Sequence, residues 1–233
     1  MKFKELLDES TSVKPKTRKE LEQIIKDTIE KEGDECDLNF IDTSLITDMS
    51  YLFDYMRKFN GKIDKWNTSK VKNMEGMFFN AESFNQPIGN WDTSNVKTME
   101  AMFNGAESFN QPLDKWNTSN VKTMEGMFCC AHKFNQPIGD WDTSNVTNMS
   151  RMFFGAHKFN QPIGNWNTSK VKNMGSMFYK ATSFNQQIGD WDVSKVKNFS
   201  SIFVLSAFDQ PISNWKISKN ANTEGMIWYW NHE

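Results

Sequence analysis

The chain has 233 residues, a formal net charge of −2 and an aromatic content of 14%, which includes 19 Phe and 9 Trp. Disordered chains are poor in aromatic residues, so this composition predicts a folded protein. A near-neutral charge provides no basic excess to attract nucleic acid, and no nucleic-acid partner is expected.

The start of the chain and its hydropathy bear on targeting. Residues 1–10 lack the apolar stretch of about 7 to 15 residues that a secretory signal requires. No apolar run approaches the roughly 18 to 20 residues that span a bilayer, so membrane insertion is not expected. The sequence is typical of a protein that stays inside the cell, of one whose signal has been removed, or of one exported by an unconventional route.

Residues 17–32 form the first predicted element, a helix that caps one end of the fold. Thr17 and Glu20 have the spacing of a capping box, which satisfies free N–H groups in the first helical turn. The apolar residues of one helical face are Leu21, Ile24, Ile25 and Ile29. Docking of this face to a partner helix or a membrane is the alternative, and the mixed charges around it disfavour a membrane. We assign residues 1–37 to an N-terminal helical cap.

A 25-residue repeat follows and dominates the chain. Its marker is a Trp that recurs every 25 residues, with a last interval of 24. The Trp residues are Trp66, Trp91, Trp116, Trp141, Trp166, Trp191 and Trp215, and Ile41 takes the same place one period earlier. Positions within a repeat are counted from this Trp, and the residues that share a position form a column. A repeat of this length indicates a solenoid, which we assign to residues 38–219.

Apolar residues occupy fixed columns of the repeat. Ile or Leu stands at −3, Ile or Val at +5, Met at +8, Met-Phe at +11 and +12, Ala at +15 and Phe at +18 in most repeats. One coil cannot bury so many large side chains alone, whereas stacked coils bury each column against its neighbours. Together with the Trp column, these positions are the predicted core.

Two local elements are predicted within each coil. Val, Thr and Trp favour strands, so a short parallel strand is expected around the Trp and the Thr at +2. Pro at −4 suits the entry of that strand, where its missing N–H costs least. The apolar spacing between +5 and +12 is helical and predicts a short helix or 3₁₀ arc, although other assignments of this arc are compatible with it.

An Asn column at −6 predicts a structural ladder. Its members are Asn60, Asn85, Asn110, Asn135, Asn160 and Asn185. A buried Asn side chain both donates and accepts hydrogen bonds, so stacked Asn residues can link backbone groups of successive coils. Binding of a ligand by this column is the alternative.

The column at +1 is the candidate binding surface. Asp and Asn alternate in it over seven coils, as Asp42, Asn67, Asp92, Asn117, Asp142, Asn167 and Asp192. Carboxylates stacked about 4.8 Å apart would repel one another. Alternation doubles that separation and lets each Asn donate to both neighbours, which explains the pattern structurally. The functional interpretation is an acidic, hydrogen-bonding face for a cation, a glycan or a basic protein.

Lysines form a further polar column. They stand at +6 as Lys72, Lys97, Lys122, Lys172 and Lys197, and at +4 as Lys70, Lys170 and Lys195. Glu75, Glu100 and Glu125 lie three residues beyond the first three and are expected to offset their charge across a helical turn. The prediction is a solvated, salt-bridged face, with nucleic-acid binding as the alternative.

His132 and His157 share one column, and Cys129 and Cys130 lie close to the first of them. Two imidazoles about one coil apart could hold a metal ion, but the sequence offers no evident third or fourth ligand. The three cysteines make a poor disulfide framework because their number is odd and two are adjacent. We therefore expect surface histidines and partly buried thiols, with no metal site.

The repeat decays at the end of the chain. Asn220 and Thr223 replace the expected Val and Met, and residues 226–230 are strongly aromatic. We assign residues 220–233 to a C-terminal cap or a truncated repeat. The alternatives are an exposed surface that binds a second subunit, or the point at which a longer protein was cut.

The full motif reads Phe-Asn-Gln-Pro-Ile-x-x-Trp-Asp-Thr-Ser-x-Val-x-x-Met-x-x-Met-Phe. It resembles the BspA-type leucine-rich-repeat surface proteins, in their 25-residue subfamily of mycoplasma-like and gut bacteria, and the resemblance covers residues 38–227. It implies a leucine-rich-repeat-like solenoid whose +1 column points outward on the concave strand face. It also implies attachment to a surface or a partner, and it carries no catalytic residues.

These features predict a non-catalytic binding or adhesion module that engages a protein or a glycan through the outward strand face. The resemblance places it at the bacterial cell surface or outside the cell. No Ser-His-Asp order, HExxH, phosphate loop or GxGxxG motif is present, so we expect neither an enzyme nor a cofactor. An intracellular scaffold or effector-type interaction protein in the cytoplasm is the alternative.

Overall fold

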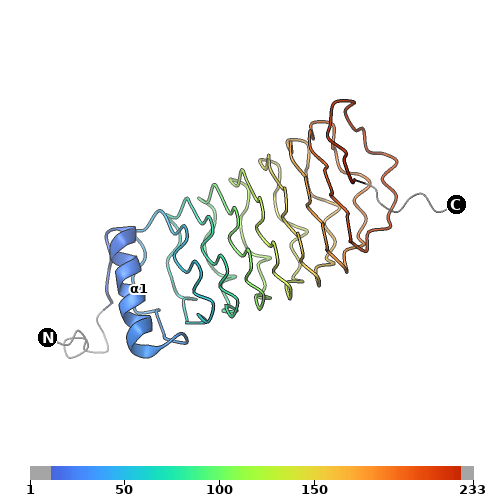
Figure 1. Ribbon diagram of the computed structural model, residues 1–233. Helices are drawn as coiled ribbons and strands as arrows, with labels where there is room; N and C mark the ends of the chain where they lie inside the picture. Colours follow the sequence, from blue (N-terminus) through green and yellow to red (C-terminus); the bar gives the residue numbers. More distant parts are fainter. Residues whose placement is uncertain (1–11, 227–233) are drawn as a thin grey trace.

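The computed structural model describes residues 12–226, which form one helix and a stack of coils. Helix α1, Arg18–Glu32, lies at one end of the stack, and the coils follow in chain order toward the opposite end (Figure 1). The repeat solenoid predicted from the sequence is confirmed.

Helix α1 begins at a capping residue and packs one face on the core. Thr17 is extended, and its Oγ1 accepts a hydrogen bond from the backbone N–H of Glu20 at 3.2 Å. Leu21 and Ile25 are fully buried in the same apolar core as the coils. The guanidinium of Arg18 donates from Nε to the carbonyl oxygen of Ser50 at 3.0 Å. The helix therefore closes this end of the core, which a solenoid needs because its first coil has no neighbour.

The core runs continuously along the stack of coils. The repeat Trp side chains are only 3% to 7% exposed, and the Phe side chains at +12 and +18 of the central coils are fully buried. The ring centroid of Phe78 lies 3.9 Å from that of Phe84 in the same repeat and 5.5 Å from that of Phe103 in the next. Each coil thus covers the apolar side chains of its neighbours.

The short parallel strand expected around the Trp is not formed. The backbone N–H of Trp91 donates to the carbonyl of Ile88 at 3.1 Å, and that of Val96 donates to Thr93 at 2.9 Å. Because these turns use groups that a strand ladder would need, the described residues contain no continuous strand. Isolated parallel bridges recur instead at +7, such as the bridge between Thr98 and Thr123.

Side chains connect the coils where the backbone ladder is missing. The indole Nε1 of each repeat Trp donates to the −3 carbonyl of the preceding coil, as Trp141 does to Leu113 at 3.1 Å. The Thr at +2 is buried, and its Oγ1 donates to the +1 carbonyl of the next coil, as Thr118 does to Asp142 at 3.0 Å. These bonds satisfy the polar atoms that the repeat places in an apolar core.

The arc from +8 to +14 is neither a helix nor a 3₁₀ segment. Alternate N–H groups donate to the next coil, as Met74 does to Thr98 at 3.2 Å and Phe78 does to Met102 at 2.9 Å. The N–H groups between them close turns within the coil, as Met77 does to Met74 at 3.3 Å. The residues at +10 and +14 adopt left-handed conformations with φ between 51° and 72°. Turns of this kind bury the same apolar positions that the helical spacing suggested.

The Asn column at −6 forms a hydrogen-bonded ladder. Each Asn Oδ1 accepts from the backbone N–H one coil further on, as Asn110 accepts from Asn135 at 2.9 Å. The Gln after each Asn adds a side-chain bond, as Gln136 Nε2 donates to Asn110 Oδ1 at 3.0 Å. The ladder therefore links successive coils along the side of the solenoid that precedes the Trp.

Candidate interaction surfaces

The Asp/Asn column at +1 lies on the surface, and its side chains shape local turns. The Oδ1 of Asp92 accepts from the backbone N–H of Ser94 at 2.9 Å, and that of Asn117 accepts from Ser119 at 3.0 Å. Asn117 Oδ1 also accepts from the Ser119 hydroxyl at 2.7 Å. Within the described chain, no side-chain hydrogen bond joins neighbouring members of this column. The expected Asn bridges between coils are therefore wrong: each Asn side chain is oriented by hydrogen bonds from the serine of its own coil, and its amide N–H groups do not reach the neighbouring Asp.

These hydrogen bonds favour the charged form of the Asp members. The serine at +3 lowers the pKa of Asp92, Asp142 and Asp192 below its ordinary value, through its hydroxyl and its backbone N–H. Lys14 pairs with Asp42 at 2.7 Å and lowers the pKa of that carboxyl to about 2. The column consequently presents an ionised carboxylate in every second coil at neutral pH.

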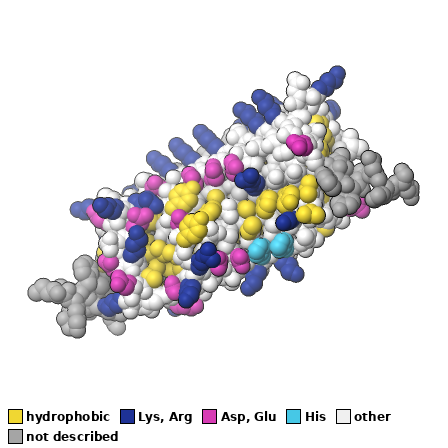
Figure 2. Space-filling model, viewed as in Figure 1, with side chains coloured by type: hydrophobic (Ala, Val, Ile, Leu, Met, Phe, Trp, Pro, Cys, Tyr) yellow, Lys and Arg dark blue, Asp and Glu magenta, His cyan; other side chains and the backbone are white. Residues whose placement is uncertain are grey.

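The lysine columns at +4 and +6 lie along one edge of the solenoid. Figure 2 shows basic side chains projecting in a row from one long edge. The backbone N–H of Lys97 donates to the carbonyl of Lys72 at 2.9 Å, so neighbouring lysines of the +6 column stand in register. Among residues 12–226, no lysine of either column has a carboxylate oxygen within 4.0 Å.

The salt bridges expected between the lysines and the glutamates at +9 are therefore not formed. An i,i+3 pair meets across a helical turn, and the arc between +5 and +12 is not helical. The glutamates act on one another instead. Partial burial raises the pKa of Glu100, and the charges of Glu125 and Glu75 in the neighbouring coils raise it further.

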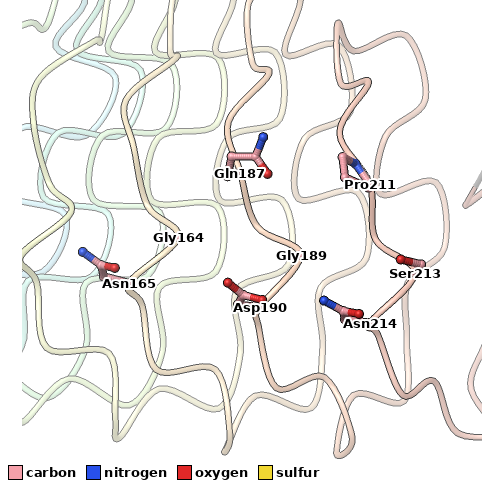
Figure 3. Close-up of a pocket in the computed structure, with 8 residues that line it drawn as sticks. All are labelled: Gly164, Asn165, Gln187, Gly189, Asp190, Pro211, Ser213 and Asn214. Carbon is pink, nitrogen blue, oxygen red and sulfur yellow. The ribbon is translucent and has the colours of Figure 1, made fainter.

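A shallow polar hollow lies on the C-terminal coils (Figure 3). Its volume is about 310 Å³, and its lining consists of Gly164, Asn165, Gln187, Gly189, Asp190, Pro211, Ser213 and Asn214. Figure 3 shows the side chains of Asn165, Asp190 and Asn214, at −1 of successive coils, in a row beside it.

The hollow was not predicted from the sequence, although the recurring Gly at −2 was an available signal. A Cβ at Gly164 would lie 2.6 Å from the carbonyl oxygen of Gln187 in the next coil, which is closer than real Cβ contacts. The absence of a side chain at this position therefore lets successive coils approach closely along the hollow.

The histidines and adjacent cysteines form a small titratable cluster. The rings of His132 and His157 stack with centroids 4.7 Å apart, and His132 Nδ1 lies 3.8 Å from Glu107 Oε2. Cys129 donates its S–H toward Cys130 Sγ at 3.8 Å, which lowers the pKa of Cys130 to about 6 with help from the charge of His132. The described chain holds no group of three or more His, Cys, Asp or Glu side chains placed to bind a metal ion.

Fewer core residues are buried in the C-terminal coil than in the central ones. Met226 and Trp215 are buried, whereas Phe203, Phe208 and Ile212 are only partly covered. The rest of the aromatic tail lies outside the described residues, so the expected C-terminal cap is described only as far as Met226. Within residues 12–226, no helix has both the length and the apolarity to cross a membrane.

Stacked 25-residue coils with an aromatic core and exposed polar columns define this protein as a repeat solenoid. The sequence matches the family described as "Mycoplasma protein of unknown function, DUF285" over residues 19–138 and again over residues 127–232. The two overlapping matches cover most of the chain, and the chain belongs to this family. Comparison with curated proteins and with solved structures gave no match.

Proposed function

We propose that the protein is a non-catalytic binding or adhesion module that engages a protein or a glycan through exposed columns of its solenoid. The observation that carries this proposal is the arrangement of side chains after the Trp. Those at +1, +4 and +6 are exposed in nearly every coil, while those at +2 and +5 are buried. A stack of this kind presents similar groups in register over an extended surface, which is how solenoid proteins bind their partners.

The finer part of the proposal is a relation to the BspA-type leucine-rich-repeat surface proteins. The repeat motif supports that relation, and with it a location at the bacterial cell surface or outside the cell. In this proposal the +1 column is the contact surface. Its support is the exposed carboxylate that Asp92, Asp142 and Asp192 present in every second coil.

A triple variant, Asp92→Asn, Asp142→Asn and Asp192→Asn, tests the +1 column. Asn preserves the side-chain oxygen that accepts from the serine N–H, as Asn117 shows, and removes only the charge. We expect the wild-type protein to be retained on a glycan array or on a panel of immobilised extracellular proteins, and the variant to be lost from the same spots. A matched control changes Asp64, Asp114 and Asp140, outside the column and outside the hollow, to Asn. Equal retention of wild type and triple variant would remove the +1 column from the proposal.

An intracellular scaffold is the second candidate function, because polar groups held in register along a solenoid can equally bind a cytoplasmic protein. Protease treatment of intact source cells separates it from the surface module. Cleavage on intact cells supports the adhesion module. Protection until the cells are lysed supports the scaffold and directs the search to cytoplasmic partners.

A further inference from the structure

Charge is distributed unevenly along the edge that carries the lysine columns. Between +1 and +9, the repeats of Trp66, Trp91 and Trp116 contain four lysines and four carboxylates. The same positions in the last three repeats contain six lysines and two carboxylates, Asp192 and Glu224. The six lysines form the C-terminal lysine patch: Lys170, Lys172, Lys195, Lys197, Lys216 and Lys219.

The patch arises because residues change within otherwise regular columns. The +9 column carries Glu75, Glu100 and Glu125 in the repeats of Trp66, Trp91 and Trp116, and Gly175 and Ser200 in the repeats of Trp166 and Trp191. At +1, where Asp and Asn alternate, the last repeat has Lys216. Negative charge at +9 is thus absent from the coils of Trp166 and Trp191, where lysines occupy both +4 and +6, and the last coil adds Lys216 and Lys219.

The lysines of the patch form no ion pair within the described residues, and the more distant charges of Lys195 and Lys216 act on Asp192, whose pKa they help to lower. All six are exposed, and among the described residues none has a carboxylate oxygen within 4.0 Å. Lys170 Nζ donates to the neutral amide oxygen of Asn145 at 2.7 Å. The backbone N–H of Lys197 donates to the carbonyl of Lys172 at 2.8 Å, which sets these two residues about 4.8 Å apart. Like charges opposed at this spacing destabilise the fold, so the patch has no evident structural benefit.

The surroundings of the patch favour sugars over other polyanions. Ser169 and Ser194 directly precede Lys170 and Lys195, and Asn167 lies three residues before Lys170, so hydroxyl and amide groups accompany the lysines. The polar hollow is on the same three coils, and its lining includes the amides of Asn165 and Asn214 and one carboxylate, that of Asp190. Amides and hydroxyls can exchange hydrogen bonds with sugar hydroxyls.

Nucleic acids and membranes fit these positions less well. Single-stranded nucleic acid is bound by aromatic side chains on which bases stack, and positions +1 to +9 of these coils expose no aromatic residue. Binding to a lipid surface uses apolar side chains that insert beside the charges, and the large apolar residues at these positions are buried or half-buried.

We propose that the C-terminal lysine patch binds a linear acidic polysaccharide through its sulfate or carboxylate groups. The lysines repeat at one-coil intervals along the solenoid axis, and such a polymer carries its charges at regular intervals along a chain. This inference rests on the proposed binding function and names the class of glycan. It uses a different set of residues from the Asp/Asn column, so the two can fail separately.

Heparin serves as the probe, and two charge-reversal variants of the full chain are compared. The patch variant is Lys170→Glu, Lys172→Glu, Lys195→Glu and Lys197→Glu. The control variant is Lys70→Glu, Lys72→Glu, Lys97→Glu and Lys122→Glu, which reverses the same number of charges in the same two columns. At fixed ionic strength we expect the Kd for heparin to rise at least about 100-fold in the patch variant and less than about 10-fold in the control. Wild-type affinity should fall as salt is raised.

Three results would overturn the inference. The first is absence of heparin binding by the wild-type protein in low salt, and the second is an equal loss in both variants, which would reflect net charge alone. The third is equally tight binding of double-stranded DNA, or of phosphatidylserine vesicles, which would assign the patch to another class of partner. Circular dichroism and thermal unfolding check that each variant is folded, and a set with Gln in place of Glu repeats the comparison if a Glu variant unfolds.

The two proposals are separated by exchanging their variants. The Asn triple variant of the +1 column keeps every lysine, so we expect its heparin affinity to equal or exceed that of wild type. If the wild-type protein captures an array partner but does not bind heparin, the proposed function stands and the polysaccharide inference is rejected. Loss of array capture in the triple variant with intact heparin binding supports both surfaces.

Discussion

Hydrogen bonds from individual side chains link neighbouring coils at points where no backbone hydrogen bond does so. Trp141 buries its indole and donates its N–H to Leu113 of the preceding coil at 3.1 Å. Burial of a large apolar side chain contributes about 1.5 to 3 kcal/mol, and a satisfied hydrogen bond about 0.5 to 1.5 kcal/mol. Because each Trp makes both contributions, the Trp column connects the apolar core to the turn at −3 of the preceding coil.

Cys130 is expected to be the most reactive of the three thiols. The hydrogen bond from Cys129 and the charge of His132 lower the pKa of Cys130 to about 6, while burial raises the pKa of Cys36 to about 11. The thiolate is the nucleophile, and a lowered pKa keeps more of it populated at neutral pH. Alkylation of Cys130 by iodoacetamide should therefore be faster than that of Cys36 at pH 7 and should slow as the pH is lowered, as peptide mass spectrometry would show.

The effect of the Cys129 hydrogen bond on the pKa of Cys130 can be tested separately. Cys129→Ala removes the donor and should move the midpoint of Cys130 alkylation to higher pH, whereas Cys129→Ser keeps a donor. Alkylation of the buried Cys36 at the same rate as Cys130 at pH 7 would contradict the assignment.

At the scale of the element, the arc from +8 to +14 depends on left-handed residues. The column at +10 contains glycine in some coils and other residues in the rest, yet φ is similar in both cases, at 57° for Gly126 and 51° for Ala101. L-residues with a side chain pay about 1 to 2 kcal/mol for this conformation, and glycine does not. The coils thus follow the same backbone path, but those without glycine at +10 adopt it at a conformational cost.

A matched pair of substitutions measures that cost. A Cβ at Gly126 would have its nearest neighbour at 3.7 Å, so Gly126→Ala introduces no clash and should destabilise the protein by about 1 kcal/mol, the φ strain less the entropy that Ala removes from the unfolded chain. Ala101→Gly in the same column should stabilise it, by less than about 1 kcal/mol because glycine gains entropy in the unfolded chain. Urea unfolding of both variants provides the test, and destabilisation by Ala101→Gly would show that the left-handed strain is negligible.

For the whole molecule, each coil contacts only its neighbours, so stability should depend on how many coils are stacked in register. Helix α1 covers one end, with Leu21 and Ile25 taking the place of a preceding coil. The central coils are alike in their buried columns, and any of them can serve as neighbour to any other.

Removal of two whole repeats, residues 117–166, should leave a folded and shorter solenoid. The deletion joins Trp116 to Asn167, which preserves every core column and the alternation of Asp and Asn at +1. We expect a lower midpoint of urea unfolding because fewer interfaces between coils remain. Deletion of residues 117–165 instead leaves one extra residue in the repeat and should be less stable than the in-register deletion. If the two deletions unfold at the same urea concentration, the columns do not define the register.

The period, the buried columns and the capping helix could all be predicted from the sequence. Trp66, Trp91 and their successors can be shielded from water only if every repeat stacks in the same way, so the buried set follows from the period alone. The exposed place of Asp92 follows from the buried residues on either side of it, Trp91 and Thr93. Whether any of these surfaces binds a partner is a matter for the experiments proposed above.

Only the tertiary structure determined the path of the backbone and which charged side chains come close to one another. Whether the N–H of Trp91 bonds within its own coil or to the next depends on three-dimensional geometry, because both acceptors are ordinary carbonyls. Lys72 and Glu75 would approach each other on a helix, but the turns between them prevent a salt bridge. The hollow beside Gly164 and Pro211 requires residues from different coils, which only the packed stack brings together. A repeated sequence thus determines which positions are buried, while hydrogen-bond geometry between coils determines how the chain reaches them.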